Sequence, residues 1–430
     1  MKIAYITAGA AGMYCGNCLR DHALARALRE LGEEVTLTPI YTPLQTDLEP
    51  GPEVRRGPVF FNGIRAYLEQ HVPYLRKPRP VMDRLLGSRP VDALLSRLPV
   101  GTNAAKLGAM THSMLLGEDG YQKKEIEQIL EWLKKDLKPD IVHISNLLLV
   151  GMARRIKEEL GVPIVCTLQS EDHFIDELPE PFRSKCIEEI KARAEALDGM
   201  VAVSTAYRSA VCGKYGLDEG RVHVILPGIP LEGHRQKTKK DSSEPLQLGY
   251  FARISPEKGL DKLCEAFCAL SRDGNDQLVL RAGGYLPRSS AEWLEGVSSA
   301  LDRAGVSDRT ELLGTLDRQE KLQFLSELDL FSVPAQRPES KGLYALEAMA
   351  SGVPVVLPDE GVFPELISPG GGGFLYDPTD RDGLKSALGV LIADPDLRER
   401  FGREGMESAR LHFSSERMAK DTIAYYSRLA

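Results

Sequence analysis

The sequence predicts an α/β protein built from two domains of similar size, with a cleft between them. Short apolar runs alternate with glycine-rich or polar turns and amphipathic helices along most of the chain. This alternation is typical of parallel sheets that are covered by helices on both faces. The pattern restarts after residue 245, and 430 residues are enough for two or three domains.

The first half of the chain follows the strand–helix pattern from its start. Residues 2–7 (KIAYIT) form a predicted strand, and residues 18–31 carry leucine and alanine at helical spacing. Gly32 is placed to end that helix. Further predicted strands cover residues 35–40, 141–145, 164–168 and 199–204. We therefore expect a first domain over residues 1–232.

The second half repeats the pattern. Residues 246–252 and 277–283 are predicted strands, with a predicted helix at 259–270 between them. Further predicted strands cover residues 310–314, 328–334 and 353–358. Residues 233–245 are polar and charged without apolar periodicity, and they are interpreted as a solvated linker rather than an anion site.

Residues 52–120 break the pattern, because they are rich in proline, arginine and aromatic residues and too long for a plain connection. We expect an insertion in the first domain that shapes a substrate or partner surface and governs acceptor choice. Its cations would meet an anionic acceptor or a lipid headgroup, or simply solvate the surface. These cations are Arg76, Lys77, Arg79, Arg84 and Arg89.

Composition excludes several classes of protein. Asp and Glu outnumber Lys and Arg by 62 to 54, which does not suggest a nucleic-acid binder. No run approaches the ~20 apolar residues that cross a bilayer, and the N-terminus reads as a strand rather than a signal peptide. Seven scattered cysteines are not a disulfide framework. We expect a cytoplasmic protein, with peripheral association at the inner face of the membrane left open and the oligomeric state unassigned.

The loop after the first strand (8–18) contains Gly9, Gly12 and Gly16 ahead of a helix. Such glycines allow a close approach to a phosphate, or they only permit a tight turn, and their spacing is not that of the dinucleotide fingerprint. Cys15 and Cys18 form a CxxC within this loop. A fourth ligand is missing, so no metal is predicted.

Two motifs in the second half are suited to a nucleotide diphosphate. Arg253 and Lys258 flank a turn between a strand and a helix, where ligands bind in open α/β sheets. Glu339 and Glu347 flank Gly342, at which a helix over 342–350 is expected to begin. That helix start offers N–H groups to a phosphate, while the carboxylates suit hydroxyl groups.

The pairing of R-x-S-P-E-K-G-L (253–260) with P-E-S-x-G-L-x-x-L-E-A-M-A-x-G-x-P-V-V (338–356) resembles the retaining nucleotide-sugar glycosyltransferases of family four, which have the GT-B fold. Looser similarity covers nearly the whole chain. The resemblance implies two Rossmann-like domains facing each other across a cleft: an acceptor-binding domain (1–232) and a nucleotide-sugar-binding domain (246–412). A terminal helix (413–430) would pack back on the first domain.

The resemblance also implies roles for residues. Arg253 and Lys258 would bind the diphosphate and Glu339 the transferred sugar, and these three are the candidate catalytic residues. Glu347 would bind the ribose. The remaining candidate donor contacts are Gly12 near the phosphates, Gly342 and Leu343 at sugar and phosphate, and Gly283, Gly284, Leu313 and Gly314 near the base.

Two positions depart from the family pattern. Gln169 stands where many relatives have the histidine of T-x-H, so it can hydrogen-bond a sugar but cannot act as an acid or base. Asp172 and His173 lie close enough in sequence to be further candidate contacts to sugar or acceptor. Lys341 replaces an aromatic residue, which leaves the identity of the sugar open.

The expected reaction is retaining transfer of a hexose from a UDP-, ADP- or GDP-linked donor to a hydroxyl of a sugar, lipid or small molecule. No metal or cofactor is required in this interpretation, because Arg253 and Lys258 offset the phosphate charge. Two alternatives remain at this point. One is a nucleotide-sugar epimerase on the same fold, and the other is a non-catalytic protein that binds nucleotide sugars or glycans.

Overall fold

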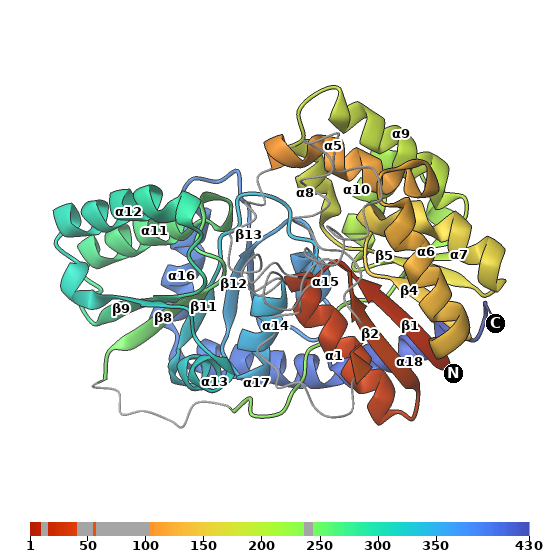
Figure 1. The fold of residues 1–430 in the computed structure, drawn as a ribbon. Coiled ribbons are helices and arrows are strands. Elements are labelled where there is room, and N and C mark those ends of the chain that lie inside the picture. Colours follow the sequence, from red (N-terminus) through yellow and green to blue (C-terminus); the bar gives the residue numbers. More distant parts are fainter. Residues whose placement is uncertain (10–15, 41–54, 57–103, 236–243, 430) are drawn as a thin grey trace, which may run out of the picture. The chain divides into compact units, whose positions relative to one another are not determined.

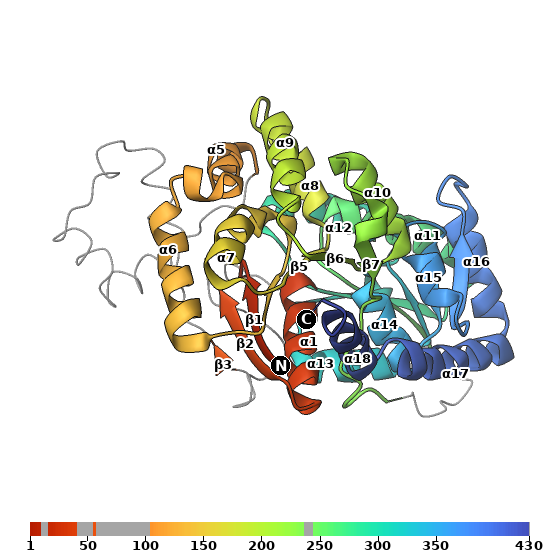
Figure 2. The same cartoon turned by 90° about the vertical axis from the view of Figure 1, so that its right-hand side faces the viewer.

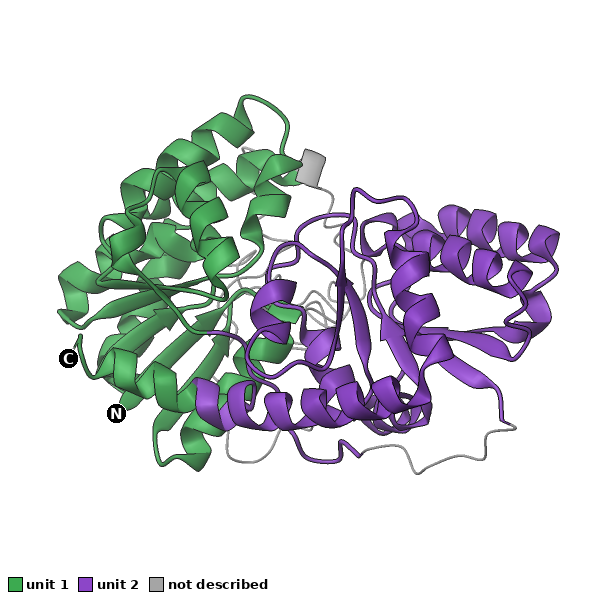
Figure 3. Cartoon of the chain, turned by 180° about the vertical axis from the view of Figure 1, so that it is seen from behind, with its two compact units in different colours: residues 1–225, 419–430 green, residues 226–418 purple. Residues whose placement is uncertain are grey.

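The computed structural model describes residues 1–9, 16–40, 55–56, 104–235 and 244–429. Contacts divide the chain into two compact units (Figure 3). Unit 1 comprises Met1–Ile225 with Ala419–Ala430, and unit 2 comprises Leu226–Met418. Most of the predicted insertion and most of the predicted linker lie outside the described residues.

Unit 1 is built on one parallel sheet with the strand order β3-β2-β1-β4-β5-β6-β7. Figure 1 and Figure 2 together label its strands. Its strands are β1 (Lys2–Thr7), β2 (Glu34–Pro39), β3 (Arg55–Arg56), β4 (Ile141–Ile144), β5 (Ile164–Leu168), β6 (Gly199–Ala202) and β7 (Val222–Val224). Its longer helices are α1 (Gly16–Glu30), α5 (Ala104–Leu115), α6 (Lys123–Trp132), α7 (Ala153–Leu160), α9 (Phe182–Ala194) and α10 (Thr205–Tyr215). Shorter helical segments are η2 (Gly117–Asp119), η3 (Leu133–Leu137), η4 (Leu147–Met152), α8 (Glu171–Asp176) and η5 (Glu219–Arg221).

Unit 2 is built on a second parallel sheet with the order β10-β9-β8-β11-β12-β13. Its strands are β8 (Leu246–Phe251), β9 (Leu278–Gly283), β10 (Thr310–Gly314), β11 (Leu330–Ser332), β12 (Val355–Pro358) and β13 (Gly373–Tyr376). Its helices are α11 (Leu260–Arg272), α12 (Ala291–Ala304), α13 (Arg318–Glu327), α14 (Leu343–Ala350), α15 (Phe363–Ile367), α16 (Gly383–Ala393) and α17 (Pro395–His412), with short turns η6 (Pro256–Lys258), η7 (Arg288–Ser290) and η8 (Ser307–Arg309).

The two-sheet α/β class that the sequence predicts is confirmed, and the reason is visible in the cores. Strand residues such as Val142 in unit 1 and Leu248 and Val356 in unit 2 are fully buried, as expected for strands covered on both faces. Each sheet also reverses its strand order once. β1 lies between β2 and β4, and β8 lies between β9 and β11, so each unit has a switch point at which ligands bind in such folds.

The last helix, α18 (Ser415–Tyr426), is labelled in Figure 2. It begins in unit 2 and ends in unit 1. Within unit 1, the ring of Tyr425 stacks on His223 of β7 with centroids 5.0 Å apart. The hydroxyl of Tyr426 hydrogen-bonds Nδ1 of His143 on β4. The end of the helix is therefore part of the packing of the first sheet.

Candidate active site

A partly buried ion pair lies at the switch point of the unit 2 sheet. Lys258 ends η6 after β8, and Glu339 follows β11, the neighbouring strand. The ammonium group of Lys258 donates a hydrogen bond to the Glu339 carboxylate, and the two side chains are 21% and 13% exposed. Two residues that the sequence places 81 positions apart thus meet where this class of sheet binds ligands.

Backbone contacts hold the loops that carry this pair. The N–H of Gln336 donates to the carbonyl of Glu257 at 2.9 Å, which ties the loop after β11 to η6. Gly259 has a φ of +70°, and a β-carbon there would lie 2.0 Å from the carbonyl oxygen of Pro334. Only glycine fits this close approach. The geometry of the Lys258–Glu339 pair is therefore set by the fold rather than by flexible side chains alone.

The charge of Glu339 is strongly stabilised. Burial raises the pKa of this carboxyl, but the attraction and hydrogen bond of Lys258, together with nearby Lys341, outweigh it and lower the pKa to about 2. The hydroxyl of Tyr344 also donates to the carboxylate at 3.1 Å. Glu339 is thus a fixed anion at neutral pH, able to accept hydrogen bonds from hydroxyl groups.

The second carboxylate of the motif is paired in the same manner. Glu347 lies on α14, and its Oε1 accepts a hydrogen bond from Nζ of Lys321 on α13 at 2.6 Å. The side chains of Lys321 and Glu347 are 5% and 16% exposed. Sequence reasoning missed Lys321, although a signal existed. Residues 321, 324, 325 and 328 have the spacing of a core-facing helix stripe, and a lysine occupies its first position.

Gly342 starts α14 as the sequence predicts. Its φ is +62°, and a β-carbon would lie 2.9 Å from Cδ1 of Leu366. The position therefore requires glycine both for its backbone conformation and for space. The first turn of α14 presents backbone N–H groups, including that of Leu343, with the partial positive charge that suits an anion.

The structure does not bring Arg253 into the same cluster. Its guanidinium pairs with Glu257 within the same turn, and the side chain is 52% exposed. Arg253 follows β8, as predicted, so it lies at the carboxyl end of the sheet. Its role toward a diphosphate stays a prediction.

The glycines predicted near the base lie together. The N–H of Gly284 donates to the carbonyl of Gly314 at 2.7 Å, which joins the ends of β9 and β10. Gly284 has a φ of +143°, and a β-carbon there would lie 1.7 Å from the carbonyl oxygen of Ala252. Gly283 ends β9, whereas the side chain of Leu313 packs against the unit 2 core.

Gln169 of unit 1 is fully buried. Its Nε2 donates to Asp21 at 3.1 Å and to the carbonyl of Ser145 at 2.7 Å. Burial raises the pKa of Asp21, although Arg20, Tyr5 and Gln169 stabilise its charge. In this structure the side chain of Gln169 has no exposed surface, so a direct contact with a sugar would require it to be uncovered.

The two neighbouring candidates are more accessible. Asp172 accepts a hydrogen bond from the hydroxyl of Tyr207 at 2.7 Å, and Nδ1 of His173 lies 3.8 Å from the other Asp172 oxygen. The side chain of His173 is 38% exposed. Gly12 and Cys15 lie outside the described residues, and Cys18 is buried on α1.

The described part of the chain has neither a metal-binding cluster nor a membrane-spanning helix. Its His, Cys, Asp and Glu side chains form no group of three or more that could hold a metal ion. Within the same residues, no helix combines the length and the apolar character that a membrane span needs.

Comparison with known proteins identifies the chain as a glycosyltransferase. The model of Glycosyltransferase Family 4 matches residues 117–232, and that of Glycosyl transferases group 1 matches residues 232–408. The chain belongs to the glycosyl transferases group 1 family. The second match contains the Lys258–Glu339 and Lys321–Glu347 pairs.

Named relatives are about 30% identical to this chain over the aligned residues. It is 31% identical to alpha-maltose-1-phosphate synthase of Mycolicibacterium smegmatis, over 67% of this chain and 79% of that protein. It is 31% identical to D-inositol 3-phosphate glycosyltransferase of Nocardia farcinica, over 78% of this chain and 79% of that protein. The enzyme of that name from Salinispora tropica is 29% identical, and the chain spans 63% of its length.

Solved structures share the fold. Sucrose-phosphate synthase from Thermosynechococcus elongatus superposes with a TM-score of 0.72 at 19% identity, covering 99% of this chain and 98% of that one. Anabaena HepE in complex with UDP superposes with a TM-score of 0.70 at 18% identity, covering 100% of both chains. The catalytic domain of starch synthase IV from Arabidopsis thaliana, bound to ADP and acarbose, superposes with a TM-score of 0.67 at 15% identity. The match covers 100% of this chain and 99% of that one.

Proposed function

We propose that this glycosyltransferase moves a hexose from a nucleotide diphosphate sugar to an acceptor hydroxyl with retention of the anomeric configuration. The observation that carries the proposal is the arrangement around α14. Two carboxylates, Glu339 and Glu347, are each paired with a lysine beside a helix start at the β8/β11 switch point. This site offers cations and N–H groups to phosphates, and anions to hydroxyl groups.

Each group has a role in this proposal. Lys258, together with Arg253, binds the diphosphate, so Lys258 is shared between Glu339 and the phosphate oxygens. Glu339 accepts hydrogen bonds from hydroxyls of the transferred sugar, and Glu347 accepts them from the ribose. The N–H groups of Gly342 and Leu343 contact sugar and phosphate.

The remaining candidate contacts follow the same division. Gly283, Gly284, Leu313 and Gly314 lie near the base in this proposal, at the ends of β9 and β10. Unit 2 would bind the donor, whereas unit 1 would contribute the acceptor surface, with Asp172 and His173 as its accessible candidates.

The chemistry needs charge stabilisation at two places. As the anomeric C–O bond breaks, negative charge grows on the diphosphate and positive charge on the sugar ring. Lys258 faces the first charge and the ionised Glu339 the second. An oxygen of the leaving diphosphate can take the acceptor proton, so no strong protein base is needed, and the cations offset the phosphate charge without a required metal.

The donor is proposed to be a UDP-, ADP- or GDP-sugar, and the acceptor a sugar, lipid or small molecule that carries a free hydroxyl. The fold neighbours described in complex with UDP and with ADP support a nucleoside diphosphate at this fold. The names of the relatives support a sugar or a small polyol phosphate as acceptor.

A binding and product experiment tests this proposal. Thermal unfolding with UDP, ADP or GDP at 100 times the dissociation constant should show about 2.7 kcal/mol of added stability for the matching diphosphate. The matching nucleotide sugar is then incubated with simple sugars and polyols, and the product linkage is read by NMR. An α-linked product from an α-linked donor is expected. Release of a sugar with changed ring configuration, still linked to the nucleotide or free, would instead favour an epimerase. Failure to bind any of the three diphosphates would refute the proposal.

Three variants should fail in different ways. Lys258→Ala should lower kcat by about 10²–10³, as for the loss of a contact to developing charge. Glu339→Ala should lower kcat and kcat/KM together while affinity for the free diphosphate stays near normal. Glu347→Ala should mainly raise KM, because the ribose does not change charge during the reaction.

Lys262→Ala serves as the control for these kinetics, since Lys262 is an exposed lysine on the next helix that pairs with Glu265. Steady-state kinetics and calorimetric titration distinguish the cases. Wild-type behaviour of all three variants would show that this cluster is not the active site.

A further inference from the structure

We propose that Lys321 is a positioning residue that holds the Glu347 carboxylate for a ribose diol, and that it thereby sets the preference for ribonucleotides over 2′-deoxyribonucleotides. The inference rests on the proposed function, in which Glu347 binds the ribose. Its direct basis is the bond from Nζ of Lys321 to Oε1 of Glu347 at 2.6 Å, which joins α13 to α14.

Lys321 occupies a position that packing alone would give to an apolar residue. The buried side chains of α13 are Lys321, Phe324 and Leu325. Removing a lysine from water is costly unless a charged partner compensates for the loss of hydration. Here the partner is Glu347, and the aromatic face of Phe251 lies 5.9 Å from Nζ. The role of the lysine at this position is therefore its charge interaction with Glu347.

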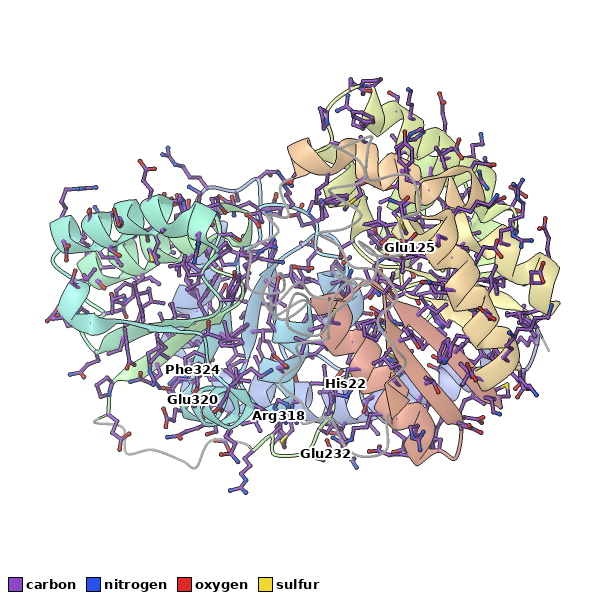
Figure 4. The ribbon with its side chains drawn as sticks, in the orientation of Figure 1. His22, Glu125, Glu232, Arg318, Glu320 and Phe324 are labelled. Carbon is purple, nitrogen blue, oxygen red and sulfur yellow. The ribbon has the colours of Figure 1, made fainter. Side chains whose placement is uncertain are left out.

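The helix that carries Lys321 is itself anchored. Asp317 and Glu320 form a capping box at its start. Arg318 donates to the carbonyl of Glu232 at 2.8 Å, and both residues are labelled in Figure 4. The guanidinium of Arg281 lies 5.4 Å from the ring centroid of Phe324. These contacts fix α13 at its start and along its inner face, so Nζ of Lys321 acts from a defined place.

Holding one oxygen of a carboxylate restricts how the other can turn. The side chain of Glu347 is 16% exposed, so it is not closed off from solvent while its Oε1 is engaged by Lys321. A vicinal diol can donate two hydrogen bonds to a carboxylate only if the carboxylate keeps its orientation. Without Lys321, the flexible Glu347 side chain would turn toward water, and the benefit of the 2′-hydroxyl would fall.

The experiment compares affinities for two probes by calorimetry. The probes are whichever of UDP, ADP and GDP binds best and its 2′-deoxy counterpart. A hydrogen bond to a charged group predicts that the wild type prefers the ribonucleotide by about 10- to 100-fold. Lys321→Met should bring this ratio close to one and leave the affinity for inorganic pyrophosphate unchanged. Lys321→Arg, which retains the cation, should restore part of the ratio.

A double-mutant cycle supplies the test that a purely structural role would fail. If Lys321 acts through Glu347, Lys321→Met should have no further effect on the ratio in a Glu347→Gln background. Gln323→Met is the matched control, because Gln323 lies on the exposed side of the same helix and bonds to Glu327. It should leave the ratio and the pyrophosphate affinity as in the wild type.

The outcomes separate the two proposals. If the wild type binds none of the diphosphates, the proposed function and this inference fall together. If the wild type prefers the ribonucleotide and Lys321→Met keeps the full ratio, only the inference falls. Equal losses for both nucleotides and for pyrophosphate, with a lower melting temperature, would also overturn it, because they indicate a structural role.

Discussion

Replacing Lys258 with methionine should raise the pKa of the Glu339 carboxyl from about 2 to above the ordinary glutamate value of 4.5. In the wild type, burial raises this pKa, but the cation and hydrogen bond of Lys258 reverse its effect. Methionine keeps most of the side-chain length and removes the charge. Lys341 and Tyr344 remain, but their contributions to lowering the pKa are smaller than that of Lys258.

The size of the effect follows from the two pKa values. The difference between 4.5 and about 2 corresponds to roughly 3 kcal/mol in favour of the ionised carboxyl. Because the pKa is lower in the folded protein than in the unfolded chain, this stabilisation is present above pH 4.5 and is lost as the pH falls toward 2. In Lys258→Met, the pKa of Glu339 should be higher in the folded protein than in the unfolded chain. The stability of this variant should therefore be lost as the pH rises through the folded-state pKa of Glu339.

The assay is carbon NMR of protein labelled at the glutamate carboxyl carbons. The Glu339 signal is assigned by its absence in Glu339→Gln. In the wild type it should remain that of a carboxylate down to the pH at which circular dichroism first reports unfolding. In Lys258→Met its midpoint should lie above 4.5.

Arg253→Met is the control, because Arg253 pairs with Glu257 on the same turn. It should raise the pKa of Glu257 and leave the Glu339 signal unchanged. A Glu339 midpoint between 4 and 5 in the wild type, or no change in Lys258→Met, would refute the electrostatic reasoning.

Three further outcomes are expected. Tyr426→Phe should lower the free energy of unfolding by about 1–3 kcal/mol in a denaturant titration, because the buried ring of His143 loses a hydrogen-bond partner. Gly342→Ala should lower the melting temperature much more than Gly305→Ala, since both have positive φ but only the first β-carbon would meet a side-chain atom at 2.9 Å. Burial raises the pKa of Glu171 to about 7, so wild-type stability should fall by roughly 3 kcal/mol as the pH rises from 4.5 to 7, whereas calorimetry of Glu171→Gln should show no such loss.

Local sequence patterns were sufficient to predict most elements that frame the site. The start of α14 at Gly342 and the strands β5 and β10 agree with the predicted ranges. Apolar periodicity and glycine placement are local signals, so they report local structure well. β13 was not predicted, because its few residues follow a run of glycines and its side chains are only half-buried.

Long-range charge pairing was beyond such patterns. The sequence places Lys258 after a strand and Glu339 in the loop before a helix, but their bond to each other depends on which strands are neighbours. The core-facing stripe of its helix indicates that Lys321 is buried, but no local pattern indicates its partner, which is 26 residues further on. Likewise, local patterns do not report that the amide of Gln169, a candidate contact to sugar or acceptor, bonds to Asp21, which is 148 residues earlier. The roles of the site residues toward a donor stay predictions.

Unit 1 is formed by two segments of the chain that are far apart in sequence, and this has a consequence for folding during synthesis. Residues 419–430 belong to unit 1, yet the ribosome adds them only after the whole of unit 2. Tyr426 follows His143 by 283 positions in the chain. At a synthesis rate of ~5–20 residues per second, His143 therefore lacks this hydrogen-bond partner for roughly 15–60 s after its own synthesis. Unit 2 is continuous and can finish first. A nascent chain should therefore acquire a protease-resistant second unit before its first unit is complete, in reverse of the order of synthesis.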